Sequence, residues 1–283
     1  MATIAIHGMG EMGSAIAGRL IANGARVVTS LKDRSAATVR RAAAVGVKIV
    51  EESALLEDAG LVLSIVPPAA AAAVASRSLA LIKQSRSKPL FIDCNAVAPQ
   101  TLRAISGPFV DGGLRFADGS IIGPSPKPGG PSPRLYLSGA VLEEAALLAS
   151  RGLDTRVLSE ALGDASALKM AYAGFTKGFQ ALATAMALGA ARNGVAENLV
   201  AELRDSQPAL YAWLARMLPG MYPKAYRWDD EMREIARFLE PEPGSVQMLT
   251  GAADLYRLVA AQYQEGPQAE VISTLNRFSK PEA

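Results

Sequence analysis

GMGEMG, residues 8–13, is the stretch that decides the fold, because it lies between a short apolar run at residues 3–7 and a helical pattern at residues 11–23. In such a strand–turn–helix, the first glycine permits the tight turn, the second lets a phosphate approach the backbone, and the third lets helix and strand pack closely. The N-terminus of the helix offers unpaired N–H groups to that phosphate. A lone GxGxxG can also be a glycine-rich turn without a ligand, but the flanking elements favour a dinucleotide-binding turn. Its predicted contacts are Gly8, Met9, Gly10, Glu11, Met12 and Gly13.

The first 160 or so residues alternate short apolar runs with helical stretches, which is typical of a doubly wound α/β sheet. The early runs are continuously apolar, as expected of parallel strands that are covered on both faces. Further strands are predicted at residues 26–30, 47–50, 61–66, 90–93, 116–121 and 134–138. We therefore expect an α/β Rossmann domain over residues 1–162.

The pattern changes after Gly163. Residues 164–193 contain no proline, are rich in Ala, Leu, Met and Lys, and start with Asp164 as a candidate N-cap. They predict a helix about 45 Å long. No convincing strand follows, and we expect helices interrupted at Pro208, Pro219, Pro223, Pro241 and Pro243. Residues 163–283 are thus expected to form an all-α domain for substrate binding and dimerisation.

The stretch GPSPKPGGPSP at residues 123–133 is a loop by composition. It is either a plain surface connection or a flap on the substrate side.

Composition excludes several classes of function. A net charge of +2, with basic and acidic residues interspersed, gives no reason to expect nucleic-acid binding. Cys94 and His7 are the only residues of their kinds, so we expect no disulfide, no thiolate metal site and no histidine-based triad. No signal peptide is recognised, and the apolar runs fall short of the roughly 18 residues of a membrane span. We expect a cytoplasmic protein with a small-molecule substrate and no metal, and His7 as a packed histidine at a strand end.

The end of the second strand distinguishes NAD from NADP. An acidic residue there would bind the ribose 2′-OH of NAD, whereas a 2′-phosphate favours hydroxyls and cations. Leu31 stands at the expected position of the acid, and its neighbours Ser30, Lys32 and Arg34 predict NADP as the cofactor. NAD stays possible, because a shift of one residue would bring Asp33 to that position. The same residues could also be solvated loop residues.

Five segments in order resemble the β-hydroxyacid dehydrogenase family, whose first domain is similar to that of 6-phosphogluconate dehydrogenase. They are GMGEMG (8–13), IVPP (65–68), DCNAVAP (93–99), DGSIIG (118–123) and GDASALKMAYAG (163–174). The resemblance extends over about residues 3–190. In addition, KAYRWDDEMREIA (224–236) resembles a subgroup with a short C-terminal domain of unassigned function.

This resemblance implies roles for individual residues. Lys169 aligns with the family's catalytic lysine. Val66, Pro67 and Pro68 would line the nicotinamide-ribose side of the cofactor, and Asn95 would lie near nicotinamide and substrate. Substrate contacts are expected from Ser120, Ile122, Gly123 and Tyr172.

Two positions depart from the family pattern. Ile122 stands where the family has a substrate-binding Ser, and Ala173 stands where it has an Asn four residues after the lysine. Tyr172 and Ala173 also replace the His-Asn pair of true 6-phosphogluconate dehydrogenases. That activity is therefore not expected, and carboxylate binding in the usual way is in question.

The chemistry of hydride transfer supports a role for Lys169. Transfer to a carbonyl needs a proton donor near the developing alkoxide, and the reverse reaction needs a base. The alternative is a surface lysine on an Ala-rich helix. Lys177 lies two turns further on nearly the same face and is a candidate for an anionic substrate group. Trp228 and Met232 are either pocket residues or the core of an amphipathic helix.

Three functions fit the sequence. The first is an NADP-preferring oxidoreductase that acts on a small 3-hydroxyacid or a related oxo compound, with Lys169 as general acid and base. The second is an imine reductase on the same scaffold, and the third is a non-catalytic NADP sensor. We also expect a homodimer through the helical domain, because ~120 helical residues carry much apolar surface and members of the resembled family typically associate this way.

Overall fold

The computed structural model describes residues 3–32, 34–126 and 130–280. The chain divides into two compact units, residues 1–170 and 171–283, and each is described by itself. Helix α6 (Asp164–Arg192) begins in the first unit and continues into the second. The sequence predicted a boundary at residues 162/163, just before this helix, whereas residues 164–170 of α6 belong to the first unit.

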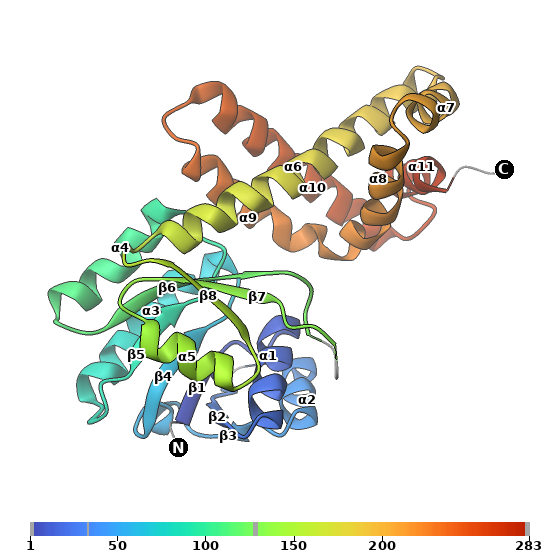
Figure 1. Ribbon diagram of the computed structural model, residues 1–283. Helices are drawn as coiled ribbons and strands as arrows, with labels where there is room; N and C mark the ends of the chain where they lie inside the picture. The colour runs from blue at the N-terminus through green and yellow to red at the C-terminus, as the bar shows by residue number, and fades with distance from the viewer. Residues whose placement is uncertain (1–2, 33, 127–129, 281–283) are drawn as a thin grey trace. The chain divides into compact units, whose positions relative to one another are not determined.

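The described residues of the first unit form an eight-stranded sheet in the order β3-β2-β1-β4-β5-β6-β7-β8 (Figure 1). Its strands are β1 (Thr3–His7), β2 (Arg26–Thr29), β3 (Lys48–Ile49), β4 (Ala59–Ser64), β5 (Leu90–Asp93), β6 (Phe116–Ile122), β7 (Arg134–Ser138) and β8 (Asp154–Ser159). Among these strands, β6 and β7 pair antiparallel and the other neighbours pair parallel. The strand order reverses at β1, which lies between β2 and β4, and such a switch point is where open α/β sheets bind ligands. The predicted Rossmann fold is confirmed.

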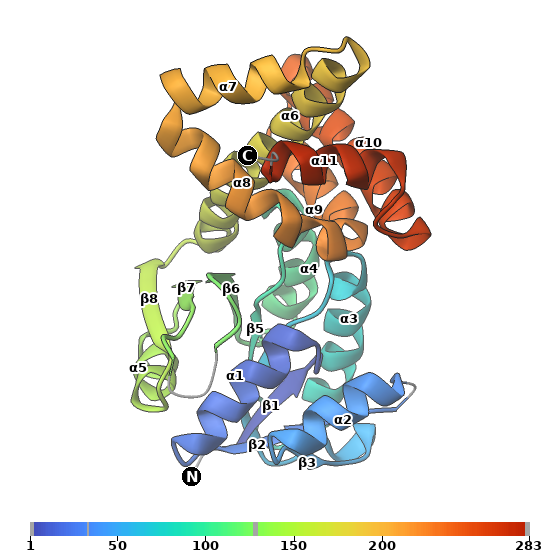
Figure 2. The ribbon, with the colours of Figure 1, turned by 90° about the vertical axis from the view of Figure 1, so that its right-hand side faces the viewer.

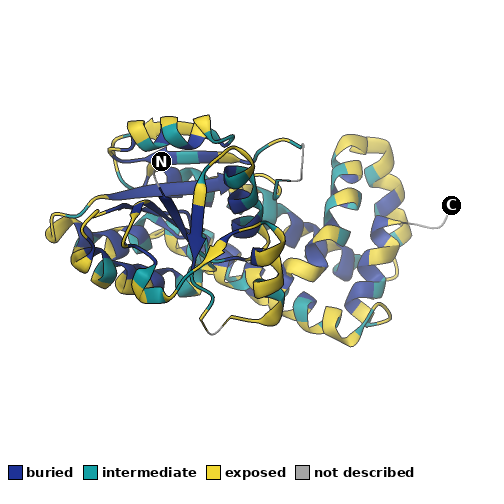
Figure 3. Ribbon diagram, turned by 90° about the horizontal axis from the view of Figure 1, so that it is seen from below, coloured by how far each residue is buried: buried dark blue, intermediate teal, exposed yellow. Residues whose placement is uncertain are grey.

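Helices cover both faces of the sheet, and each face has its own hydrophobic core. The helices of one face are α1 (Glu11–Ala22), α2 (Ala36–Ala44) and α5 (Leu142–Ser150), and those of the other are α3 (Pro68–Gln84) and α4 (Pro99–Asp111). On the second face the rings of Phe91, Phe109 and Phe116 pack against one another, with centroids 5.1 to 5.6 Å apart. Figure 3 shows that the central strands are almost wholly buried, whereas helices expose their outer sides. A 3-10 turn, η1 (Glu52–Ala54), precedes β4.

The structure corrects two details of the predicted sheet. Strand β8 was not predicted, because DTRVLS at the edge of the sheet is half-buried to exposed and lacks an apolar pattern. Strand β7 was predicted, but its antiparallel pairing with β6 interrupts the parallel sheet.

The second unit is helical throughout its described residues, as predicted. After α6 it contains α7 (Ala196–Ser206), α8 (Pro208–Met221), the 3-10 turn η2 (Tyr222–Lys224), α9 (Ala225–Phe238), α10 (Pro243–Glu265) and α11 (Glu270–Ser279). Trp228 of α9 meets Tyr256 of α10 edge to face, with centroids 5.1 Å apart. Helices α8 and α11 lie side by side (Figure 2). The Tyr211 hydroxyl of α8 donates to the Phe278 carbonyl of α11 over 2.8 Å.

Two further observations concern the helices. Pro219 lies inside the last turn of α8, so the prediction that it interrupts a helix is wrong. In the part of the chain that the structure describes, the helices fall short of the length and apolar character that crossing a bilayer requires.

Candidate active site

The glycines of the first turn have different reasons to be glycine. Gly8 has a φ of +93°, and an added Cβ would overlap the carbonyl oxygen of Ile65. A Cβ on Gly13 would overlap the carbonyl oxygen of Gly8. These two positions are therefore fixed by close approach of backbone segments. A Cβ on Gly10, in contrast, would have no atom within 4 Å, so there is room for a phosphate to approach the backbone.

The start of α1 complements this turn. Gly10 is its N-cap, and no described side chain accepts a hydrogen bond from the first-turn amides. Free amides and the positive end of the helix dipole favour an anion at this point. The open space at Gly10 and the uncapped helix together fit the pyrophosphate of a dinucleotide.

The loop after β2 carries the residues predicted to select NADP. Lys32 and Arg34 are exposed and Ser30 is half-buried, while Asp33 lies outside the described residues. Arg41 of α2 was not identified from the sequence, yet its Nε donates to the Met9 carbonyl over 3.2 Å. This contact joins α2 to the glycine-rich turn. It depends on tertiary packing, so no sequence pattern could have predicted it.

A row of polar side chains crosses the sheet at one level. His7, Ser64, Asp93, Asp118 and Ser138 are successive register partners on β1, β4, β5, β6 and β7. The level of the row is where β1, β4 and β5 end. Such groups are stable inside a protein only when their hydrogen bonds are made there.

His7 forms one end of this row. Its Nε2 lies 2.9 Å from the Ser78 hydroxyl of α3. Burial, assisted by the positive charges of Arg77 and Arg34, lowers its pKa to about 4. His7 is therefore neutral at pH 7, in the manner of a packed histidine.

Asn95 joins the loops that follow β4 and β5. Its side-chain carbonyl accepts from the Val66 amide over 2.7 Å, and its Nδ2 donates to the Ser64 hydroxyl over 3.0 Å. This bond brings Asn95 to the segment of Val66, Pro67 and Pro68, which follows β4. The loops that carry the residues predicted to line the nicotinamide side are thus hydrogen-bonded to each other. Direct contact of these residues with a cofactor stays a prediction.

Asp93 and Asp118 are buried acids on adjacent strands. Asp118 Oδ2 accepts from the Ser166 amide and the Ser138 hydroxyl, over 2.8 and 3.1 Å, and Oδ1 accepts from the Ser166 hydroxyl over 2.7 Å. Asp93 Oδ1 accepts from the Asn95 amide over 2.9 Å, whereas its Oδ2 has no hydrogen-bond partner in the described structure.

Asp93 and Asp118 differ in how strongly their surroundings favour the protonated form over the charged form. Burial raises the pKa of Asp93 to about 7, against the lowering effect of Asn95, and the negative charge of Asp118 raises it further. Burial also raises the pKa of Asp118, against the lowering effect of its donors Ser166 and Ser138. Asp118 has more donors that stabilise its charged form, so Asp93 is the more readily protonated of the two acids. Burial also raises the pKa of the Cys94 thiol, which argues against a nucleophilic role.

Lys169 lies at the carboxyl end of β6. Its Nζ donates to the Ile121 carbonyl oxygen over 2.9 Å, in a half-buried position. Ser120 is buried, and its Oγ has no partner among the residues described. Ile122 is buried as well, and Gly123 follows with a φ of +130°. The first unit thus brings Lys169 to the predicted substrate segment.

The remaining predicted substrate residues belong to the second unit. Tyr172 is half exposed. Lys177 forms an ion pair with Glu231, and its Nζ lies 4.7 Å from the centroid of the Trp228 ring. Trp228 and Met232 are buried in the core of this unit. A substrate anion at Lys177 would have to compete with Glu231, so that role stays a prediction.

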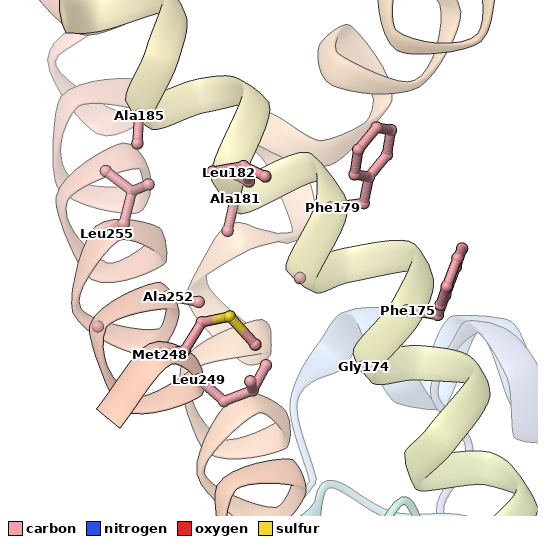
Figure 4. Close-up of a pocket in the computed structure, with 12 residues that line it drawn as sticks. Gly174, Phe175, Phe179, Ala181, Leu182, Ala185, Met248, Leu249, Ala252 and Leu255 are labelled. Carbon is pink, nitrogen blue, oxygen red and sulfur yellow. The ribbon is translucent and has the colours of Figure 1, made fainter. Parts of the chain in front are cut away.

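The second unit also has an apolar groove of about 420 Å³ between α6 and α10 (Figure 4). Phe175, beside the groove on α6, is 82% exposed. The lining consists of small and apolar side chains, namely Gly174, Phe175, Gly178, Phe179, Ala181, Leu182, Ala185, Met248, Leu249, Gly251, Ala252 and Leu255.

Two family models match parts of the chain. Residues 3–97 match a family described as NADP oxidoreductase, coenzyme F420-dependent. Residues 190–259 match a domain of unknown function (DUF1932).

Similar proteins cover nearly the whole chain. An uncharacterized 28.5 kDa protein from the 7S RNA 5′ region of Methanothermus fervidus is 26% identical over 83% of this chain and 90% of its own length. A solved conserved protein of unknown function, structurally similar to 3-hydroxyacid dehydrogenases, is 28% identical with a TM-score of 0.66, over 91% of this chain and 99% of its own. The Mycobacterium tuberculosis 3-hydroxyisobutyrate dehydrogenase with L-serine is 20% identical with a TM-score of 0.71, covering 97% and 99%. An imine reductase from Myxococcus stipitatus with NADP+ is 18% identical with a TM-score of 0.53, covering 99% and 100%.

The matches agree with the features derived from the residues. The predicted resemblance is confirmed, since a first domain of the NADP oxidoreductase type precedes a C-terminal domain of unknown function in a 3-hydroxyacid dehydrogenase-like fold. The N-terminal domain has the fold and the family match of an NAD(P)-binding oxidoreductase domain.

The buried acid Asp93 gives a test of the polar row. Between about pH 4 and 7 the folded protein keeps a proton on Asp93 that the unfolded chain releases, so this group lowers the free energy of unfolding as pH rises. In the wild type, Asp93 should lower the free energy of unfolding by on the order of 4 kcal/mol across that pH range. We expect Asp93→Asn to abolish this decrease. Urea unfolding of both proteins at several pH values measures this slope.

Asp111→Asn, at an exposed acid of the same unit, is the matched control and should leave the slope unchanged. Parallel stability–pH profiles for the wild type and Asp93→Asn would contradict protonation of Asp93.

Proposed function

We propose that the chain is an NADP-preferring oxidoreductase that transfers a hydride between nicotinamide and a small 3-hydroxyacid or a related oxo compound, with Lys169 as general acid and base. One observation carries the proposal. The same compact unit contains a turn that fits a dinucleotide and an amine at the carboxyl end of β6. That edge of an open α/β sheet is where ligands bind.

In this proposal, some residues of the first unit bind the cofactor and Lys169 transfers the proton. The turn at Gly8–Gly13 and the start of α1 hold the pyrophosphate, and the segment of Val66, Pro67 and Pro68 lines the nicotinamide-ribose side. The bound nicotinamide supplies or accepts the hydride. Lys169 donates a proton to the oxygen of the oxo substrate on reduction and takes it back on oxidation. The Ile121 carbonyl uses one of the three ammonium donors, which leaves two for the substrate.

Substrate recognition in this proposal starts from Ser120. Its hydroxyl is buried and has no protein partner within the described residues, so a substrate oxygen could satisfy it only once the residues that cover the hydroxyl move aside. Tyr172 and Lys177 belong to the second unit and stay candidates on the sequence alone, and an anionic group could bind Lys177 only in exchange for Glu231.

An imine reductase is the second candidate, and one observation favours it. Ile122 and Ala173, both buried, replace the Ser and Asn that the resembled family uses for a carboxylate, while Lys169 is retained. Protonation of an imine needs one donor and no carboxylate site. A panel of oxo acids and cyclic imines with reduced cofactor distinguishes the two. Turnover of neither, with cofactor binding intact, would favour the non-catalytic sensor.

We also propose a homodimer through the helical unit. Phe175, Leu182, Met186 and Met248 are apolar and more than half exposed, and they lie on the two helices that form the groove. A twofold partner can place the Phe175 ring of each copy into the small-residue groove of the other, as an isologous interface requires. Contiguous apolar surface of this kind typically marks an interface.

Lys169→Ala should abolish most turnover and leave cofactor affinity nearly unchanged. Removal of a general acid typically costs about 10²–10⁴ in rate, and kcat should fall by that order. The cofactor affinity should hold, because the glycine-rich turn and α1 bind the pyrophosphate independently of α6. Steady-state kinetics with the best panel substrate and fluorescence titration of NADPH measure the two effects. Lys83→Ala, at an exposed lysine of α3, should change neither. Retention of most of kcat in Lys169→Ala would show that the proton comes from elsewhere.

Arg34→Ala should reduce the preference for NADPH over NADH. Arg34 is exposed in the loop between β2 and α2, and its guanidinium suits bidentate binding of a 2′-phosphate. The loss should be on the order of tenfold in NADPH affinity, with NADH affinity unchanged. Arg40→Ala, an equal charge change on α2, is the control. Equal affinities of the wild type for both cofactors, in fluorescence titrations, would disprove the preference.

Phe175→Asp should convert the dimer to a monomer at micromolar concentration, because a buried unpaired charge is strongly unfavourable at an interface. Leu142→Asp places the same charge on an exposed apolar residue of α5 and should leave the dimer intact. Light scattering measures the mass of each protein. A monomeric wild type would remove the dimer proposal.

A further inference from the structure

The first turn of α6 is held by a side chain from the sheet. A helix N-terminus usually takes its capping group from the residue just before it. Here Asp118, from the middle of β6, receives both the amide and the hydroxyl of Ser166, over 2.8 and 2.7 Å. The Gly163 amide also stabilises this carboxylate. Asp118 and Ser166 are fully buried.

Strand β7 forms a second hydrogen-bonded contact with the first turn of α6. The Ser138 hydroxyl accepts from the Ala165 amide over 3.2 Å and donates to Asp118 over 3.1 Å. Two consecutive amides of α6 are thereby fixed to two adjacent strands. Each bond is buried, and losing a buried partner costs more than losing an exposed one.

The same strand and helix meet again one turn later. Lys169 is three residues after Ser166, and its amine bonds to Ile121, three residues after Asp118. The Lys169 amine thus contacts the same strand that holds the first turn of its own helix, so the place of the amine depends on where the helix begins.

We propose that Asp118 is a positioning residue of the reaction, which places the Lys169 amine by fixing the first turn of α6 through Ser166. Its catalytic meaning rests on the proposed function. A carboxylate is required because two oxygens must accept from several donors at once. An asparagine offers one oxygen and turns an N–H₂ toward a donor.

Competitive acetylation with acetic anhydride, read for each lysine by mass spectrometry, tests this without a substrate. In the full-length Asp118→Asn protein we expect the Lys169 labelling rate to rise about threefold or more, because a loosened first turn exposes the amine. Lys83, on α3, should label at the wild-type rate in the same sample. Ser166→Ala removes one of the two bonds between Ser166 and Asp118 and should give a smaller rise of about 1.5- to 2-fold. If Asp118→Asn does not fold, the Lys169 labelling rate of Ser166→Ala decides the test.

Asp164→Asn is the matched control, because it makes the same change of charge at the first residue of α6. Asp164 is exposed and bonds to the Ser159 hydroxyl, not to the first-turn amides held by the sheet. Its Lys169 labelling should equal that of the wild type. An unchanged Lys169 rate in folded Asp118→Asn, or an equal rise at Lys83, would overturn the positioning role.

Kinetics separate this inference from the proposed function. Once a substrate is found, Asp118→Asn should lower kcat with little change in KM, and Asp164→Asn should lower neither. If Lys169→Ala keeps its kcat, the proposed function fails, while the labelling result still decides whether Asp118 places the amine.

Discussion

Close approach of three backbone segments, at Gly8, Gly13 and Ile65, determines where the first unit can bind a ligand. Side chains are excluded from Gly8 and Gly13, so β1, α1 and the loop after β4 pack against one another without spacers. That packing brings the start of α1 to the end of the central strand. The strand order reverses at the same place, and the helices on either side diverge there. The binding edge is therefore a consequence of backbone contact and not of any catalytic side chain.

The polar row shows how a buried sheet supports that edge. Apolar residues form a core on each face of the sheet, and the row places polar side chains within this otherwise apolar layer. Several members of the row bind groups outside the sheet. Ser64 accepts from Asn95 of the loop after β5, and Asp118 and Ser138 both hold the first turn of α6. Burial lowers the pKa of His7 and raises the pKa of Asp93, so both shifts favour the neutral form and keep the total charge of the row low. Burial of so many polar groups in one layer is tolerated for this reason.

The sequence was informative where local pattern determines structure. The glycine-rich turn, seven strands and the long helix follow from periodicity and glycine placement, and Lys169 follows from a family resemblance. Contacts between distant segments were not predictable in this way. Asp118 was visible only as part of a motif, and its role depends on Ser166, 48 residues away. The sequence indicated Lys177 as a candidate for an anionic substrate group, whereas the fold pairs it with Glu231. Strand β8 is exposed at the edge, so it needs no apolar alternation and gives none.

Gly10 differs from Gly8 and Gly13 because the fold itself does not require a glycine at this position. Its backbone angles, φ −69° and ψ −170°, suit any residue, and an added methyl group would touch nothing within 4 Å. The folded chain would accept alanine there, whereas Gly8 and Gly13 are constrained by the fold itself. Selection can therefore preserve Gly10 only through a bound ligand. In a descendant that had abandoned its nucleotide, Gly10 would drift first, while the two flanking glycines would persist as a record of the ancestral fold.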